Sequence, residues 1–434
     1  MPMHLSLNLS EFGRHSGAWR HDESDVSQMP NIPAYVHASV TAERGVFDQV
    51  FIADTPVHSR GRTSVTGTRL DPFEMASAIA AHTSSIGIIA TISTSYNEPL
   101  DVARRAASAD NVLGGRLGVN YVASTGDDTA RNFGREQQLP HDQRYERSNE
   151  FIDVVTKLWA ASPQGGLAGH EVDHHGRFID VTASLEIEQP VNGRPIIVQA
   201  GSSPEGRDLA ARWADAIYAG GSTLDRAQEY YADIKARAAA YGRDPDSVKV
   251  ILGIMPFIGR TDAEAYDLHT TLDRNHVEGA DTIGHLSKLL EFDLTPFDPE
   301  GPLPFDLLPE VKSASVSQAT LFTRMAREES LTLAETAYRS YVGGLANMQF
   351  VVTGTASTVA DVMQEWYEAG TCDGFAIVAP ILPKTIDDFV DLVVPELQRR
   401  GLTRDHYEGS TLFDHFGAQA ATEITPARST ADVR

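Results

Sequence analysis

Short apolar runs recur along the chain and alternate with longer amphipathic segments. Most of the runs are nearly continuous and rich in β-branched residues, which is typical of parallel strands buried on both faces. The first run instead alternates leucine with polar residues. This pattern predicts strands over 4–10, 46–54, 86–94, 116–124, 195–201, 215–220, 248–259 and 374–380.

The segments between these runs have helical periodicity and helix-boundary residues. Pro72 stands at a favoured first-turn position, and glycines close several segments, as at helix ends. Pro395 predicts either a kink or a new helix start. The periodicity predicts helices over 72–82, 144–162, 224–242, 357–370 and 385–401. Eight strands that each precede a helical segment favour an α/β fold of the (β/α)8 TIM-barrel type over an open doubly wound sheet.

Two stretches exceed this repeat, and we interpret them as insertions in a single barrel domain over 1–415. They lie near 161–193, which is rich in glycine and histidine, and near 260–350. Long barrel insertions commonly form lids or substrate walls, so the proline-rich stretch 294–309 is the candidate lid. The small, polar tail 416–434 is expected to be disordered.

Composition restricts the possible classes of function. The 434 residues carry a formal net charge of −24, and an acidic surface disfavours binding to nucleic-acid phosphates. Cys372 is the one cysteine, which excludes an intramolecular disulfide framework and fits a reducing compartment. We find no signal-peptide pattern and no apolar stretch long enough for a membrane helix, so we expect a cytoplasmic protein that does not bind membranes.

The stretch PIIVQAGSSPEGRDLAARWADAIYAGG, residues 195–221, passes directly from a strand into a helix. Gly201, Ser202 and Ser203 lie at that junction, where barrel ligands bind. Serine is a common N-cap, and on local sequence this reading is the more frequent one. The alternative is a phosphate socket, because free N–H groups and the helix dipole attract anions.

Polar residues at other strand ends are further site candidates. Asn120 and Ser124 end the fourth strand, and Tyr145 lies near the start of the following helix. Asp54 ends the second strand, and Thr94 ends the third. Each has an ordinary alternative: Asp54 can cap a turn, and Tyr145 can simply pack.

His15 follows the first strand, beside Trp19 and Arg20. It is the candidate catalytic residue, because a histidine there can donate a proton or orient a substrate; the alternative is a capping or packing role. His170, His174 and His175 lie in a loop-like segment without the spacing of metal ligands, so no metal is expected. The sequence has no G-x-S-x-G elbow and no convincing dinucleotide fingerprint.

Taken in order, several segments resemble the bacterial luciferase superfamily. They are most similar to its two-component flavin monooxygenases, typified by nitrilotriacetate monooxygenase, pristinamycin IIA synthase and dibenzothiophene-sulfone monooxygenase. The resemblance extends to about residue 415. The matching motifs are HSGAWR (15–20), ERGVFDQVFIAD (43–54), ATISTSYNEP (90–99), NFG (132–134), RYERSNEFIDVVTKLW (144–159), GRPIIVQAGSSPEGRDLAARWADAIYAG (193–220) and VDLVVPELQRRGL (390–402).

The resemblance implies a cofactor and partners. The cofactor is FMN in its reduced form, FMNH2, which a separate NAD(P)H:flavin reductase supplies, and O2 is the co-substrate in oxygenation of a small organic molecule. A homo-oligomer, either dimer or tetramer, is also implied. The phosphate ligands carried over are Ser124, Tyr145, Ser202 and Ser203, with Gly201 and Asn120 beside them, and Asp54 and Thr94 near the isoalloxazine.

The fourth strand departs from the family pattern. Relatives usually read Gly-Trp-Asn-Val-Val-Thr-Ser, whereas this chain reads GVNYVAS (118–124), followed by Thr125. Ser124 is retained, so the departure affects the substrate pocket rather than the cofactor. Two alternatives therefore stay open beside oxygenation. One is different flavin chemistry, either oxidative breakdown of a flavin or deazaflavin-dependent hydride transfer; the other is a catalytically inactive flavin-binding protein.

Overall fold

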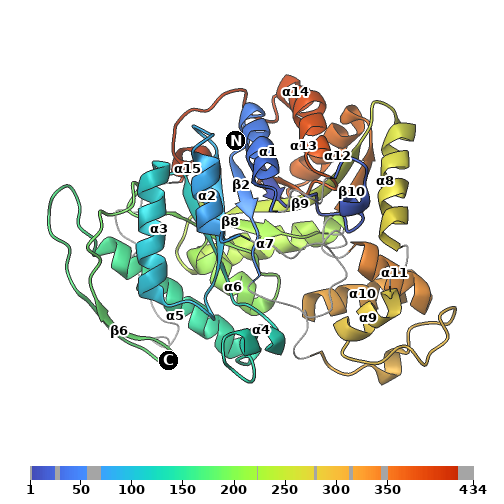
Figure 1. The fold of residues 1–434 in the computed structure, drawn as a ribbon, viewed down its shortest axis with the longest axis horizontal. Helices are drawn as coiled ribbons and strands as arrows, with labels where there is room; N and C mark the ends of the chain where they lie inside the picture. Colours follow the sequence, from blue (N-terminus) through green and yellow to red (C-terminus); the bar gives the residue numbers. More distant parts are fainter. Residues whose placement is uncertain are drawn as a thin grey trace.

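Eight parallel strands close into a barrel in the computed structural model (Figure 1), which describes residues 2–24, 30–55, 70–221, 223–277, 281–311, 316–343 and 350–418. The ring closes because β1 pairs with β11 and β8 pairs with β9. All eight predicted strands are present, with slightly shorter bounds, and the predicted TIM-barrel class is confirmed. The strands are β1 (His4–Leu9), β2 (Gln49–Ile52), β3 (Gly87–Ser93), β4 (Leu117–Val122), β7 (Ile196–Gln199), β8 (Ala216–Ala219), β9 (Lys249–Ile258) and β11 (Gly374–Ile377).

Helices surround the barrel (Figure 1). The predicted helix over 385–401 is interrupted by a π-helical segment, Phe389–Val393, and Pro395 then lies in the first turn of the next helix. The helices of this layer are α1 (Ile32–Arg44), α2 (Pro72–Ala80), α3 (Pro99–Leu113), α4 (Asp127–Asn132), α5 (His141–Ala160), α6 (Pro204–Trp213), α7 (Leu224–Ala240), α12 (Ala356–Glu368), α13 (Lys384–Asp388) and α14 (Val394–Arg399), with short 3-10 turns at Ala18–Arg20 and Pro245–Ser247.

Both predicted insertions contain secondary structure of their own. The first holds an antiparallel hairpin, β5 (Val172–His175) and β6 (Asp180–Ala183). The second holds α8 (Asp262–Val277), α9 (Thr282–Leu289), the 3-10 turn Phe305–Leu307, α10 (Val316–Glu328), α11 (Leu333–Gly343) and β10 (Phe350–Gly354). β10 pairs with the last five residues of β9, and α9, α10 and α11 gather beside the lower end of α8 (Figure 1).

The second insertion has a small apolar core separate from that of the barrel. Leu294 and Leu303, from the proline-rich stretch, are buried in it with Phe322 and Leu333. This core holds the stretch against α9, α10 and α11. Whether it acts as a lid remains a prediction.

The amino-terminal end of the barrel is closed by a short helix, α15 (Leu412–Phe416). Leu412, Phe413 and Phe416 are buried against inward-facing residues such as Ile89. Phe416 therefore belongs to the folded chain, although it was expected to begin the tail, and residues 419–434 lie outside the described part. No helix among the described residues combines the length and apolarity needed to cross a membrane.

Candidate active site

The start of α6 lies at the carboxyl-terminal end of the barrel strands, which we call the mouth. Ser203 is the N-cap of α6, and its hydroxyl accepts a hydrogen bond from the Gly206 N–H at 3.1 Å. The capping interpretation is therefore correct. The two backbones approach closely, since a Cβ added at Gly201 would lie 2.8 Å from Gly206 Cα. Ser202 is exposed, and its carbonyl accepts from Arg207 Nε at 3.0 Å.

Tyr145 reaches the same helix start from α5. A Cβ added at Gly206 would lie 3.1 Å from the Tyr145 hydroxyl oxygen. Within the described residues, no hydrogen-bond partner satisfies that hydroxyl. A phenol without a partner beside a helix N-terminus is a suitable donor to an anion.

Ser124 and Thr94 are joined to α5 by hydrogen bonds. The Ser124 hydroxyl donates to Ser93 Oγ at 2.7 Å, and its carbonyl accepts from Arg144 Nη1 at 2.8 Å. Thr94 Oγ1 lies 2.6 Å from Ser148 Oγ. The ends of β3 and β4 are thus held against the helix that carries Tyr145. We call Ser124, Tyr145, Ser202 and Ser203 the rim cluster.

Several buried polar atoms near the rim cluster have no hydrogen-bond partner in the part of the chain that the structure describes. They are Asn120 Oδ1, Arg144 Nε and Arg147 Nη1. Burial lowers the pKa of both arginines, but a guanidinium keeps its charge in proteins. The sequence analysis missed them, although both lie in the RYERS motif, because an arginine on an amphipathic helix is ordinarily exposed. They place positive charge beside the rim cluster of an acidic protein.

Asp54 and His15 lie elsewhere around the mouth. Asp54 follows β2 directly and is half-buried. His15 follows β1, and in the ring β1 and β11 stand opposite β7 and β4. The His15 ring is buried, and its Nε2 lies 3.0 Å from Oδ1 of Asp273, a residue of α8. The structure therefore does not bring His15 into the rim cluster.

A family model described as luciferase-like monooxygenase matches residues 13–372. The chain belongs to the luciferase-like monooxygenase family. The expected resemblance is confirmed. Nitrilotriacetate monooxygenase component A of Aminobacter aminovorans is 38% identical, with 96% of each chain covered. A subunit of pristinamycin IIA synthase from Streptomyces pristinaespiralis is 41% identical, with 94% of each chain covered.

Solved structures of luciferase-like proteins share the whole fold. An EDTA monooxygenase from Chelativorans sp. BNC1 superposes with a TM-score of 0.78 at 31% identity, covering 97% of this chain and 99% of its own. A riboflavin lyase, solved with modified FMN and riboflavin, superposes with a TM-score of 0.84 at 26% identity, covering 97% of both chains. The match therefore includes the insertions as well as the barrel.

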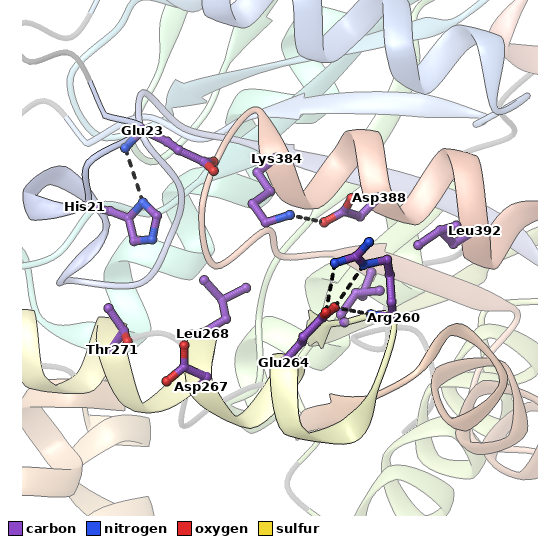
Figure 2. Close-up of a pocket in the computed structure, with 12 residues that line it drawn as sticks. His21, Glu23, Arg260, Glu264, Asp267, Leu268, Thr271, Lys384, Asp388 and Leu392 are labelled. Carbon is purple, nitrogen blue, oxygen red and sulfur yellow. Dashed lines mark hydrogen bonds and ion pairs between the residues drawn. The ribbon is translucent and has the colours of Figure 1, made fainter.

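A charged cavity of about 490 Å³ lies apart from the rim cluster of this luciferase-like chain. Figure 2 shows it between α8, α13 and the loop that carries His21 and Glu23. Its cations are already paired: Arg260 with Glu264, and Lys384 with Asp388. None of the predicted site residues lines this cavity, so we do not assign the site to it.

Proposed function

We propose that the chain is a flavin-dependent monooxygenase that uses reduced FMN from a separate NAD(P)H:flavin reductase, together with O2, to oxygenate a small organic molecule. The names of its relatives support oxygenation, and the rim cluster supports the cofactor. The single observation that carries the proposal is the Tyr145 hydroxyl, unpartnered among the described residues, at the capped start of α6. The cytoplasm is the proposed location, because NAD(P)H-dependent reduction of flavins takes place there.

The residues present fit the phosphate of FMN. A phosphate needs several donors in a small space, and Tyr145, Ser202 and the first turn of α6 offer them. Arg144 and Arg147 add nearby positive charge, and Asn120 offers an unused buried oxygen. Asp54 and Thr94 are the proposed neighbours of the flavin ring. When bound and reduced, the flavin supplies the electrons that activate O2.

The rest of the mouth can keep the reacting groups dry. Phe12, Met255, Phe257 and Val378 form a buried apolar cluster there, with Trp19 packed against it. We call this group the mouth cluster. Excluding water strengthens electrostatic interactions with a bound ligand and suppresses side reactions. The role of these side chains is thus to exclude water and to shape the substrate pocket.

The chain's relatives also bear on its partners. The similar proteins of nitrilotriacetate monooxygenase and pristinamycin IIA synthase are named as a component and a subunit, and so as parts of larger systems. We propose that this chain likewise works with a separate reductase. A homo-oligomer, dimer or tetramer, remains part of the proposal.

A second candidate function is oxidative breakdown of a flavin. The similarity to a riboflavin lyase along 97% of the chain favours it over deazaflavin-dependent hydride transfer and over a catalytically inactive flavin-binding protein. In that case a flavin would be the substrate as well as the cofactor. The two candidates differ in whether a third compound is consumed.

An oxygen-labelling experiment tests the proposal. The full chain would be incubated with a flavin reductase, NADH, FMN, ¹⁸O2 and a panel of organic amines and thioethers, including nitrilotriacetate and EDTA. The proposal predicts a product that carries one ¹⁸O atom. Label derived only from water would overturn it, and consumption of riboflavin without any panel compound would support the second candidate.

A further inference from the structure

The second insertion places three chemically active side chains beside His15. His269 and Asp273 lie on α8, and Tyr338 lies on α11. Asp273 Oδ1 lies 3.0 Å from His15 Nε2, and the Tyr338 hydroxyl donates a hydrogen bond to the same carboxylate. A barrel needs none of these residues to close, so their convergence at the mouth requires another explanation.

His15 is poorly placed to exchange a proton with a bound molecule. Its Nδ1 accepts a hydrogen bond from the Gly17 N–H at 3.1 Å, so its Nε2 carries the proton that Asp273 accepts. Both ring nitrogens are therefore engaged. The side chain is also only 2% exposed. An acid or base must come within hydrogen-bond reach of the atom that it serves, and His15 would have to release Asp273 to do so.

His269 has the access that His15 lacks. Its side chain is 30% exposed, and its ring stacks on Phe257 with centroids 3.9 Å apart. Its Nδ1 lies 3.1 Å from Thr353 Oγ1, and Thr353 is the residue of β10 that pairs with Phe257. His269 therefore stands over the carboxyl-terminal end of β9, next to the mouth cluster.

Asp273 links the two histidines. One carboxylate oxygen binds His15, and the other lies 3.9 Å from His269 Nε2, one helical turn away. Hydrogen bonds from His15 and Tyr338 hold the carboxylate in place from two other elements. We propose that His269, rather than His15, is the acid–base residue on this side of the mouth, and that Asp273 is its positioning residue. This inference rests on the proposed function.

The charges around His269 agree with this assignment. Burial lowers the pKa of His269, the carboxylate of Asp273 raises it, and the nearby His15 lowers it. The pKa of Asp273 is itself lowered by its bonds to His15 and by the two histidines, although burial opposes this. Asp273 is thus ionised at neutral pH. Replacing it by asparagine removes a carboxylate that favours protonated His269, so the pKa of His269 falls further.

An NMR titration tests the positioning claim without any substrate. Full-length protein labelled with ¹³C at histidine Cε1 would be titrated, with the His269 signal assigned by its loss in His269→Gln. The inference predicts that Asp273→Asn moves the His269 titration to lower pH, while His37→Gln, a change at an exposed histidine paired with Asp387, leaves it in place. An unmoved His269 titration in Asp273→Asn would overturn the positioning role.

The reductase-coupled assay then tests the acid–base role. His269→Gln should lower kcat by about 10²–10⁴-fold with FMN affinity unchanged, and Asp273→Asn should move the kcat–pH profile in the same direction as the NMR titration. A kcat of His269→Gln within about twofold of wild type would overturn the assignment of the acid–base residue. Absence of any labelled product from the wild type would instead reject the proposed function, and the NMR result would still decide the positioning claim.

Discussion

At the start of α6, the backbones of Gly201 and Gly206 press together beside the Tyr145 hydroxyl. The contact brings the loop after β7 against the first helical turn, so the Ser203 cap and the phenol face the same space. Capping and anion binding are therefore compatible roles of one turn. Local sequence could nominate these residues, because serine caps and glycine contacts are short-range features.

A side chain at Gly201 should disturb this turn. In Gly201→Ala the added Cβ meets backbone atoms of Gly206 at 2.8 Å and 3.0 Å, so the loop must move. We expect a loss of about 1–3 kcal/mol in stability and roughly tenfold weaker FMN binding, which is about 1.4 kcal/mol. Isothermal titration and urea unfolding measure the two. Gly301→Ala, whose nearest new contact is 3.3 Å, is the control; equal FMN affinity in both variants would contradict the account.

Asp110 predicts a pH dependence of stability. It is buried between α3 and β4, and burial raises its pKa to about 6 although it accepts N–H bonds from Val191 and Leu117. The folded state thus favours the protonated form. The stability that it contributes is complete below about pH 4 and is lost as pH rises through 6, an effect on the order of 3 kcal/mol.

Asp110→Asn should therefore flatten the curve. Between pH 4 and pH 7, the free energy of unfolding of the variant should change less than that of wild type. The exposed Asp128 provides a matched control, and Asp128→Asn should leave the pH dependence intact. Superimposable curves for wild type and Asp110→Asn would show that Asp110 is ionised in the folded protein at pH 4.

At the scale of elements, the strands were predictable because each barrel strand is a short, continuous apolar run. The contents of the insertions were not, because α9, α10 and α11 bury their apolar faces against one another. The bond between His15 and Asp273 joins positions 258 residues apart. No local pattern marks such a pair. The same applies to α15, whose apolar residues follow the last predicted helix and gain a function only inside the barrel.

Truncating the α15 plug should destabilise the barrel. Phe416 is 2% exposed and lies in the cluster inside the strands, so Phe416→Ala should cost about 3–5 kcal/mol in the free energy of unfolding. Urea denaturation measures this cost. The control is Val112→Ala at a residue that is 75% exposed, which should stay within about 0.5 kcal/mol. A similarly small cost for Phe416→Ala would mean that α15 does not close the barrel.

At the scale of the whole molecule, the net charge of −24 opposes an anionic ligand. Screening limits this repulsion to about 8–10 Å at moderate salt, so close donors decide the affinity. Arg144 and Arg147 supply positive charge on the side of β4 and α5, and the insertion supplies Asp273 and His269 on the side of β9. The mouth is thus asymmetric, with phosphate donors on one side and acid–base groups on the other.

The most direct test of the rim cluster compares two flavins that differ only in the phosphate. Anaerobic titration would give the affinities of reduced FMN and reduced riboflavin for wild type and for Tyr145→Phe/Ser203→Ala. The account predicts that wild type prefers FMN by about tenfold or more, and that this preference falls to about one in the variant while riboflavin affinity is unchanged. An equal preference for FMN in both proteins would contradict it.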